Sequence, residues 1–126
     1  MINQEIVLYH GTDIYSGLDI LNNGLNADKL KAKQIKFVQL GLGFYTTPEL
    51  EVAKFFGSLA VTSPVIQFTV IEMSLPNIVL AELLLTGQAR REKIVNVHFM
   101  AEQIWFNITC FDRLNEQAEF KPYREK

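Results

Sequence analysis

The sequence predicts an α+β fold, because short strands and helices follow one another without the regular strand–helix–strand repeat of a parallel sheet. The chain has 126 residues, about the length of one domain, and residues 1–126 contain no linker rich in Gly, Pro or Ser. Its composition is 48% hydrophobic and 21% charged, which is ordinary for a globular protein and argues against disorder. We therefore expect a single α+β domain.

The charge distribution locates the expected core. Residues 55–89 carry only Glu72 and Glu82, whereas both flanks are richly charged, so the middle third should form the centre of the core. The formal net charge is −2, so the sequence does not indicate the basic surface with which proteins bind the phosphates of nucleic acids.

The cysteine and histidine content argues against disulfides and metal sites. Cys110 is the single cysteine and His10 and His98 are the two histidines, so neither a disulfide nor a His-rich metal site is expected. The first residues lack a signal peptide pattern, and residues 55–71 are uncharged but shorter than the roughly 20 apolar residues of a membrane span. These features predict a cytoplasmic protein with no membrane segment and no metal.

The first elements follow from local signals. Residues 6–10 are β-branched and apolar, which predicts a strand that ends before Gly11. Thr12 or Asp13 can cap a helix that begins near residue 14, and Gly24 should end it.

A long segment with weak periodicity follows at residues 26–43, and it predicts a loop in which one short amphipathic turn could form. Residues 44–46 predict a second short strand. Thr47 and Pro48 then predict a helix start, with Thr47 as the cap and Pro48 at the first helical position. The expected apolar face of this helix consists of Val52, Phe55, Phe56 and Leu59.

The second half of the chain is less regular. Residues 65–73 predict a buried strand, and residues 76–85 fit either a helix or a strand followed by a turn. Residues 88–93 predict a solvated turn, residues 95–99 a strand, and residues 104–109 a strongly β-prone strand before a polar tail. If residues 76–85 are helical, the inward side chains should be Ile78, Val79, Leu83 and Leu84.

Three short segments carry more chemistry than a core requires. The first is Tyr9-His10-Gly11-Thr12, in which a histidine at a strand end precedes a glycine. A glycine permits close approach of a ligand to the backbone, and an imidazole can donate to or accept from a hydroxyl. The alternative is a histidine that only satisfies neighbouring turn groups.

The second segment, residues 41–47, reads Gly-Leu-Gly-Phe-Tyr-Thr-Thr. Its glycines permit a tight approach, and Tyr45 could stack on a flat heteroaromatic ring. The alternative is a glycine turn that enters a strand whose tyrosine belongs to the core. The segment matches neither a P-loop nor the dinucleotide-binding glycine pattern.

The third segment, residues 102–106, reads Glu-Gln-Ile-Trp-Phe and places an acid and an amide at the mouth of an apolar strand. A carboxylate there could stabilise a developing positive charge, or it could simply solvate the strand end. Cys110 and His98 lie among apolar neighbours and do not form a convincing nucleophile–base pair.

Taken in order, these segments resemble the ADP-ribosyltransferase superfamily, in the His-Tyr-Glu branch of the poly-ADP-ribose polymerases and related small bacterial domains. The resemblance rests on residues 8–12, on residues 41–47 with residues 53–56 after them, and on residues 102–103. It spans residues 7 to about 114 and implies two small packed β-sheets with flanking helices around an NAD cleft.

The resemblance implies a set of NAD-binding roles and no metal. His10 would bind the adenosine ribose, and the Gly11 backbone would bind the nicotinamide carboxamide. Thr12 would support the ribose hydroxyls, Gly43 would allow a close approach of the cofactor, and Tyr45 would stack on the nicotinamide ring.

The same resemblance implies that Glu102 or Gln103 binds the 2′-hydroxyl of the nicotinamide ribose. A carboxylate there would stabilise the oxocarbenium-like transition state of nicotinamide release. Side chains alternate along a strand, so only one of the two can face the cleft, and we favour Glu102. If Gln103 faces it, the negative charge is lost and activity should be weak, altered or absent.

The resemblance therefore implies a mono-ADP-ribosyltransferase or NAD glycohydrolase, of the kind found as a bacterial toxin or effector. The alternative is a catalytically inactive module of the same fold that binds NAD, ADP-ribose or a protein. The acceptor could be protein, nucleic acid, a small molecule or water. Residues 83–85, three consecutive leucines, are a candidate surface for a protein partner or a homo-oligomer.

Overall fold

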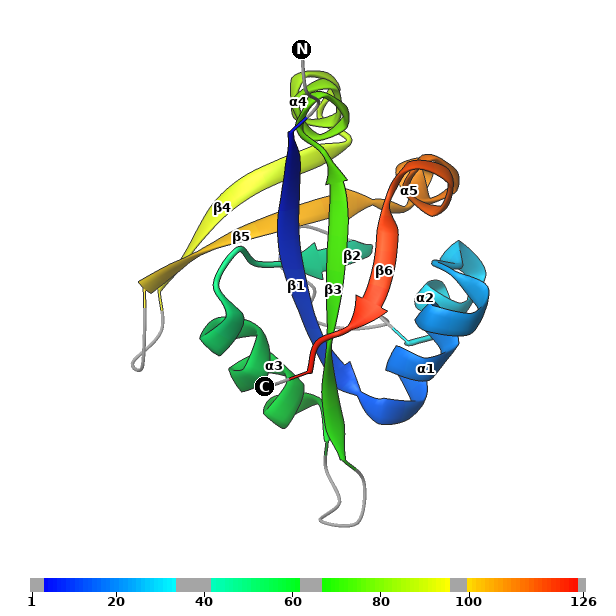
Figure 1. The fold of residues 1–126 in the computed structure, drawn as a ribbon, viewed down its shortest axis with the longest axis vertical. Helices are drawn as coiled ribbons and strands as arrows, with labels where there is room; N and C mark the ends of the chain where they lie inside the picture. The colour runs from blue at the N-terminus through cyan, green and yellow to red at the C-terminus, as the bar shows by residue number, and fades with distance from the viewer. Residues whose placement is uncertain (1–3, 34–41, 62–66, 96–99, 125–126) are drawn as a thin grey trace.

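The computed structural model describes residues 4–33, 42–61, 67–95 and 100–124. They form two three-stranded antiparallel sheets with flanking helices, which confirms the expected α+β class (Figure 1).

The first sheet has the strand order β1-β3-β6. Its strands are β1 (Glu5–Asp13), β3 (Phe68–Pro76) and β6 (Glu119–Pro122). The β1–β3 register places His10 opposite Ile71, so the two side chains lie on one face of the sheet.

The second sheet has the order β2-β5-β4, with β2 (Gly43–Thr46), β5 (Met100–Asn107) and β4 (Ala89–Val95). An isolated antiparallel bridge between Tyr9 and Thr47 joins it to the first sheet, through N–H···O bonds of 2.8 and 2.9 Å. The two sheets therefore meet where β1 passes the end of β2.

Five α-helices and one short 3-10 helix flank the described strands. They are α1 (Ile14–Asn23), α2 (Ala27–Lys33), α3 (Leu50–Ala60), α4 (Asn77–Thr86), α5 (Phe111–Gln117) and η1 (Ile108–Cys110). In Figure 1, α1 and α2 lie on the side of β6, and α3 lies across from them. No helix among the described residues is long and apolar enough to cross a membrane.

Helix α1 begins and ends where the sequence predicts. Asp13 is the N-cap, and its Oδ2 accepts a hydrogen bond from the Ser16 N–H at 3.0 Å. Gly24 follows the helix with φ 77°, in the region that favours glycine. Of the two caps expected, Asp13 is therefore the one used.

Helix α3 begins at Leu50, later than expected, and Thr47 is not its N-cap. The reason is that the Thr47 backbone is bonded to Tyr9 in the bridge between the sheets. Its Oγ1 accepts instead from the N–H of Glu49, which is the N-cap residue, at 3.1 Å.

The buried face of α3 also differs from the expected apolar face. Val52, Ala53 and Gly57 are buried, whereas Leu59 is 61% exposed. The helix backbone lies directly against β1. A Cβ atom built on Gly11 would stand only 1.8 Å from the Ala53 carbonyl oxygen, which shows how close this contact is. Only small side chains fit such a contact, so the larger apolar residues of α3 turn away from it.

Residues 76–85 are helical, which selects one of the two expectations for this segment. Pro76 is the N-cap of α4, and Val79 and Leu83 are buried as expected. The expected inward position of Ile78 is wrong, since Ile78 is 63% exposed and Leu80 is buried in its place.

The solvated turn expected at residues 88–93 is wrong. Residues 89–95 form strand β4 rather than a solvated turn, because Ala89 is buried and the charged side chains that follow suit a strand at the edge of a sheet. The expected polar tail forms two elements: Phe111 and Leu114 bury one face of α5, and β6 pairs with β3. Of the strand expected over 95–99, residues 96–99 lie outside the described residues.

The long segment 26–43 is only partly a loop. Residues 27–33 form α2, which accounts for the short amphipathic turn expected there, and residues 34–41 lie outside the described residues. Likewise, β3 begins at Phe68, and residues 65–66 of the expected strand are not described.

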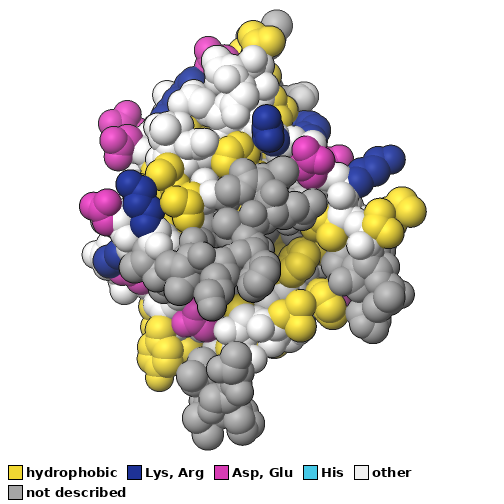
Figure 2. All heavy atoms as spheres, turned by 180° about the vertical axis from the view of Figure 1, so that it is seen from behind, with side chains coloured by type: hydrophobic (Ala, Val, Ile, Leu, Met, Phe, Trp, Pro, Cys, Tyr) yellow, Lys and Arg dark blue, Asp and Glu magenta, His cyan; other side chains and the backbone are white. Residues whose placement is uncertain are grey.

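The core lies between the two sheets and is closed by α4 and α5. Its buried cluster contains Leu8, Leu25, Phe44, Met73, Leu75, Val79, Leu80, Leu83, Ala89, Ile104, Phe106, Cys110, Phe111 and Leu114. The sparsely charged segment 55–89 thus supplies part of the core, and both flanks supply the rest. Some hydrophobic side chains also reach the surface, as Figure 2 shows from behind.

Candidate functional site

A cavity of about 220 Å³ opens between α1, α2 and the strands β1 and β2. His10, Gly43 and Phe44 line its strand side. Its polar lining consists of Thr12, Asp13, Ser16, Asp19, Asn26 and Lys29. The cavity therefore offers hydroxyl, carboxylate, amide and ammonium groups in one place.

His10 stands at the junction of the two sheets. Its Nδ1 lies 2.6 Å from the backbone oxygen of Tyr45, and since a carbonyl only accepts, Nδ1 is assigned as the protonated donor. The imidazole also packs on the Phe44 ring, with 4.3 Å between the ring centroids. These two contacts hold the imidazole at the cavity wall.

The histidine sits where the pairing between the two sheets stops. Tyr9 lies opposite Thr47, so a continued antiparallel ladder would place Gly11 opposite Tyr45. The Tyr45 carbonyl accepts from the His10 side chain at this point. The sheets can therefore separate beyond the bridge while the side chain of His10 still ties them together.

Tyr45 and Gln103 lie on one face of the second sheet. Tyr45 is directly opposite Trp105 in the β2–β5 register, and Gln103 is two residues from Trp105 on the same strand, so all three share a face. Gln103 and Trp105 are only 6% and 5% exposed. The Trp105 Nε1 lies so close to Gly43 that a Cβ atom there would be 2.2 Å from it.

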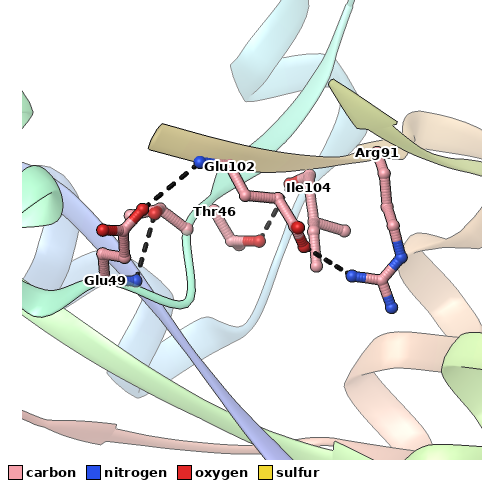
Figure 3. A network of polar contacts seen from close by, with 6 residues as sticks. Thr46, Glu49, Arg91, Glu102 and Ile104 are labelled. Atoms are coloured by element: carbon pink, nitrogen blue, oxygen red, sulfur yellow. Dashed lines mark hydrogen bonds and ion pairs between the residues drawn. The ribbon is translucent and has the colours of Figure 1, made fainter. Parts of the chain in front are cut away.

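Glu102 lies on the opposite face of β5. Its carboxylate forms an ion pair with Arg91, and its backbone N–H donates to Oε2 of Glu49 at 3.3 Å (Figure 3). On the same face, the Thr46 hydroxyl donates to the Ile104 carbonyl at 2.8 Å. The Glu102 side chain is 42% exposed, and its contact with Arg91 holds it on this face of β5.

The expected site residues thus fall into three places. His10, Thr12 and Gly43 line the cavity, and Tyr45 and Gln103 share the other face of β2 and β5. Gly11 lies beside His10 on β1, where α3 packs against it. Glu102 does not line the cavity and does not share the face of Tyr45.

Two ion pairs were not predicted from the sequence. Asp19 and Lys29 form a 2.7 Å ion pair at the cavity, across the connection between α1 and α2. Arg91, expected in a solvated turn, lies in β4 and pairs with Glu102. Neither pairing has a local sequence signal, because each joins residues on two different elements.

Other candidates carry little chemistry. Burial raises the pKa of the Cys110 thiol to about 11, and the thiol donates to the Asn107 carbonyl at 3.0 Å, so it is a poor nucleophile at neutral pH. His98 lies outside the described residues.

Of the three consecutive leucines, Leu83 is fully buried and Leu85 is 88% exposed, so they do not form one continuous surface. The described residues contain no group of three or more potential metal ligands.

Comparisons with known proteins give no independent family assignment. No protein-family model, no curated protein and no solved structure matches this chain.

Proposed function

We propose that this protein binds NAD⁺ at the junction of its two sheets and cleaves the bond between nicotinamide and ribose, as a mono-ADP-ribosyltransferase or an NAD glycohydrolase. The observation that carries the proposal is the His10–Tyr45 contact. It ties the histidine at the cavity wall to the backbone of the strand that carries Tyr45, so the first two sequence motifs lie next to each other in space.

The cavity suits the adenosine-ribose half of the dinucleotide. Ribose hydroxyls both donate and accept, and the cavity offers Thr12, Asp19 and Lys29 besides the imidazole of His10. Its volume of about 220 Å³ is below the range of whole drug-sized ligand sites, so it would hold part of NAD⁺ while the rest extends along β2.

The nicotinamide half would then lie against the face of Tyr45. The tyrosine ring can stack on the cationic pyridinium, and the Gln103 amide can bind a ribose hydroxyl. In the reaction, the C1′–N bond breaks and nicotinamide leaves with the bonding electron pair. The acceptor forms a new bond to C1′ and gives up a proton; with water as acceptor the product is ADP-ribose.

Two neighbouring side chains of β5 are the candidates for the group that faces the nicotinamide ribose. Glu102 could stabilise the developing positive charge only if the nicotinamide ribose reaches the face of β5 opposite Tyr45, where Glu102 pairs with Arg91. Gln103, which shares the face of Tyr45, could hold the ribose but cannot supply a charge. This placement favours a second candidate function, the binding of NAD⁺ or ADP-ribose without turnover.

Nicotinamide release from NAD⁺ is the test of the proposal. The purified protein should release nicotinamide or yield an ADP-ribosylated product, measured by chromatography of labelled NAD⁺. His10→Ala and Tyr45→Ala should abolish the reaction, because they remove the ribose contact and the stacking ring. Tyr15→Ala, which alters a 69% exposed ring outside the cavity, is the matched control. Absence of both products would contradict the proposal.

A pair of substitutions separates the two functions. If Glu102 supplies the charge, Glu102→Gln should lower turnover at least about 100-fold, in the range of a lost electrostatic contact in a transition state. If the protein binds NAD⁺ without turnover, calorimetry should show binding with no nicotinamide release, and Glu102→Gln should leave the affinity unchanged. In that case Gln103→Glu, which restores a carboxylate beside Tyr45, should introduce measurable release.

A further inference from the structure

Two buried hydrogen-bond donors on β5 have no partner. Among the described residues, Nε2 of Gln103 and Nε1 of Trp105 are the buried side-chain nitrogen and oxygen atoms without a hydrogen bond. Both residues are more than nine-tenths buried. Because leaving a buried donor unpaired is costly, such atoms in a folded protein usually mark a missing partner.

The two donors belong to side chains on one face of β5. They come from positions two apart on one strand, so they lie on the same face at a spacing of about 7 Å along the strand. Tyr45 is directly opposite Trp105, and the Trp105 indole nitrogen touches the backbone of Gly43, which also lines the cavity. The donors are thus next to the residues proposed to bind NAD⁺.

The indole identifies the chemistry of the missing partner. An indole N–H can only donate, so whatever satisfies Trp105 must be an acceptor. A glutamine amide can turn to present either its oxygen or its nitrogen, whereas the tryptophan has no such choice. Two uncharged donors on the same face of β5 therefore suit a ligand that carries oxygen acceptors, such as a carboxamide carbonyl or a ribose hydroxyl.

We propose that Trp105 is a ligand-binding residue, whose Nε1–H donates, together with Nε2 of Gln103, to oxygen acceptors of the nicotinamide-ribose half of NAD⁺. This rests on the proposed function. The nicotinamide-ribose half is assigned because Tyr45, the proposed stacking residue, is the cross-strand partner of Trp105. Trp105 thereby becomes a determinant of affinity in addition to the residues to which the resemblance assigns a role.

Trp105 reports on its own environment, because it is the single tryptophan of the chain. Titration of the wild-type protein with NAD⁺ should change the intensity or wavelength of its fluorescence emission. AMP, which carries only the adenosine half of the ligand, should leave the emission unchanged. Calorimetry on the same samples measures binding independently of the fluorophore.

The matched substitution is Trp105→Phe, which keeps an aromatic ring and removes the N–H. We expect about three- to tenfold weaker NAD⁺ binding by calorimetry, the usual loss for one hydrogen bond, with AMP binding unchanged. Gln103→Met, which removes the second donor at similar size, should act in the same direction and serves if Trp105→Phe does not fold. Tyr15→Phe, which removes a hydroxyl from an exposed ring, should change nothing.

The outcomes separate this inference from the proposed function. If wild-type protein binds NAD⁺ but its emission and the affinity of Trp105→Phe are unchanged, the indole N–H contacts water or nothing, and the inference is wrong while the proposed function stands. An emission change with AMP as large as that with NAD⁺ would also overturn it. If NAD⁺ gives neither heat nor nicotinamide release, the proposed function fails and the inference with it.

Discussion

Two glycines show how closely the elements of this protein approach one another. A Cβ atom on Gly11 would stand 1.8 Å from the Ala53 carbonyl oxygen, and one on Gly43 would stand 2.2 Å from the Trp105 indole nitrogen. From the sequence, both glycines suggested room for a ligand. In the structure, the space beside each is occupied by another part of the protein, so their first role is to permit packing.

Gly11→Ala should therefore destabilise the fold strongly. The new methyl group would meet the backbone of α3, which cannot rotate away as a side chain can, so we expect a loss of about 3 kcal/mol or more in the free energy of unfolding. Urea denaturation followed by circular dichroism measures it.

Gly87→Ala is the matched control for this substitution. Gly87 has φ 80° and nothing within 4 Å of a built Cβ atom, so alanine there should cost only about 1 kcal/mol through backbone strain. Equal losses in the free energy of unfolding for Gly11→Ala and Gly87→Ala would mean that the α3 backbone does not contact β1 at Gly11.

At the scale of elements, the connections decide which segments are held in place. The side chain of Asn115, on α5, accepts from the Leu25 N–H at 2.8 Å and donates to the Leu25 carbonyl at 2.9 Å. This residue thereby fixes the connection between α1 and α2, which forms one wall of the cavity. A segment near the end of the chain thus shapes a site built mainly from its first half.

Asn115→Ala should lower the free energy of unfolding by about 2 kcal/mol, because it leaves the donor and acceptor of the buried Leu25 unpaired. Glu116→Ala, on the next residue of the same helix, removes an exposed side chain and should change it by less than about 0.5 kcal/mol. Thermal or urea unfolding compares them. If Asn115→Ala were as mild as Glu116→Ala, α5 would not hold this connection.

Prediction of elements succeeded where the signals are local and failed where they are not. Helix α1 is delimited by Asp13 and Gly24, which act within the same few residues. By contrast, β4 has four consecutive charged residues in its sequence and becomes a strand only because β5 pairs with it. The face of α3 likewise depends on its contact with Gly11, which no periodicity within the helix reveals.

At the scale of the whole molecule, the two sheets share one core. Leu8 and Met73 of the first sheet belong to the same buried cluster as Phe44 and Ile104 of the second. The bridge between Tyr9 and Thr47 adds a direct backbone connection. We therefore expect the sheets to unfold together rather than in separate steps.

Met73→Ala tests this cooperativity. Truncating a fully buried residue of β3 should cost about 2–5 kcal/mol. Trp105 lies in the other sheet. The urea midpoint of unfolding measured by its emission should fall by the same amount as the midpoint measured by far-ultraviolet circular dichroism. An emission midpoint that stayed at the wild-type value would show that the two sheets unfold independently.

The sequence by itself determined the α+β class, the bounds of α1 and the short strand at residues 44–46, because each rests on neighbouring residues. It also determined that Glu102 and Gln103 point in opposite directions, which follows from the geometry of any strand. Only the tertiary structure decided which neighbours each meets: Arg91 for Glu102, and the face of Tyr45 and Trp105 for Gln103. Strand pairing and sheet packing set those neighbours, and they join residues that are far apart in the chain.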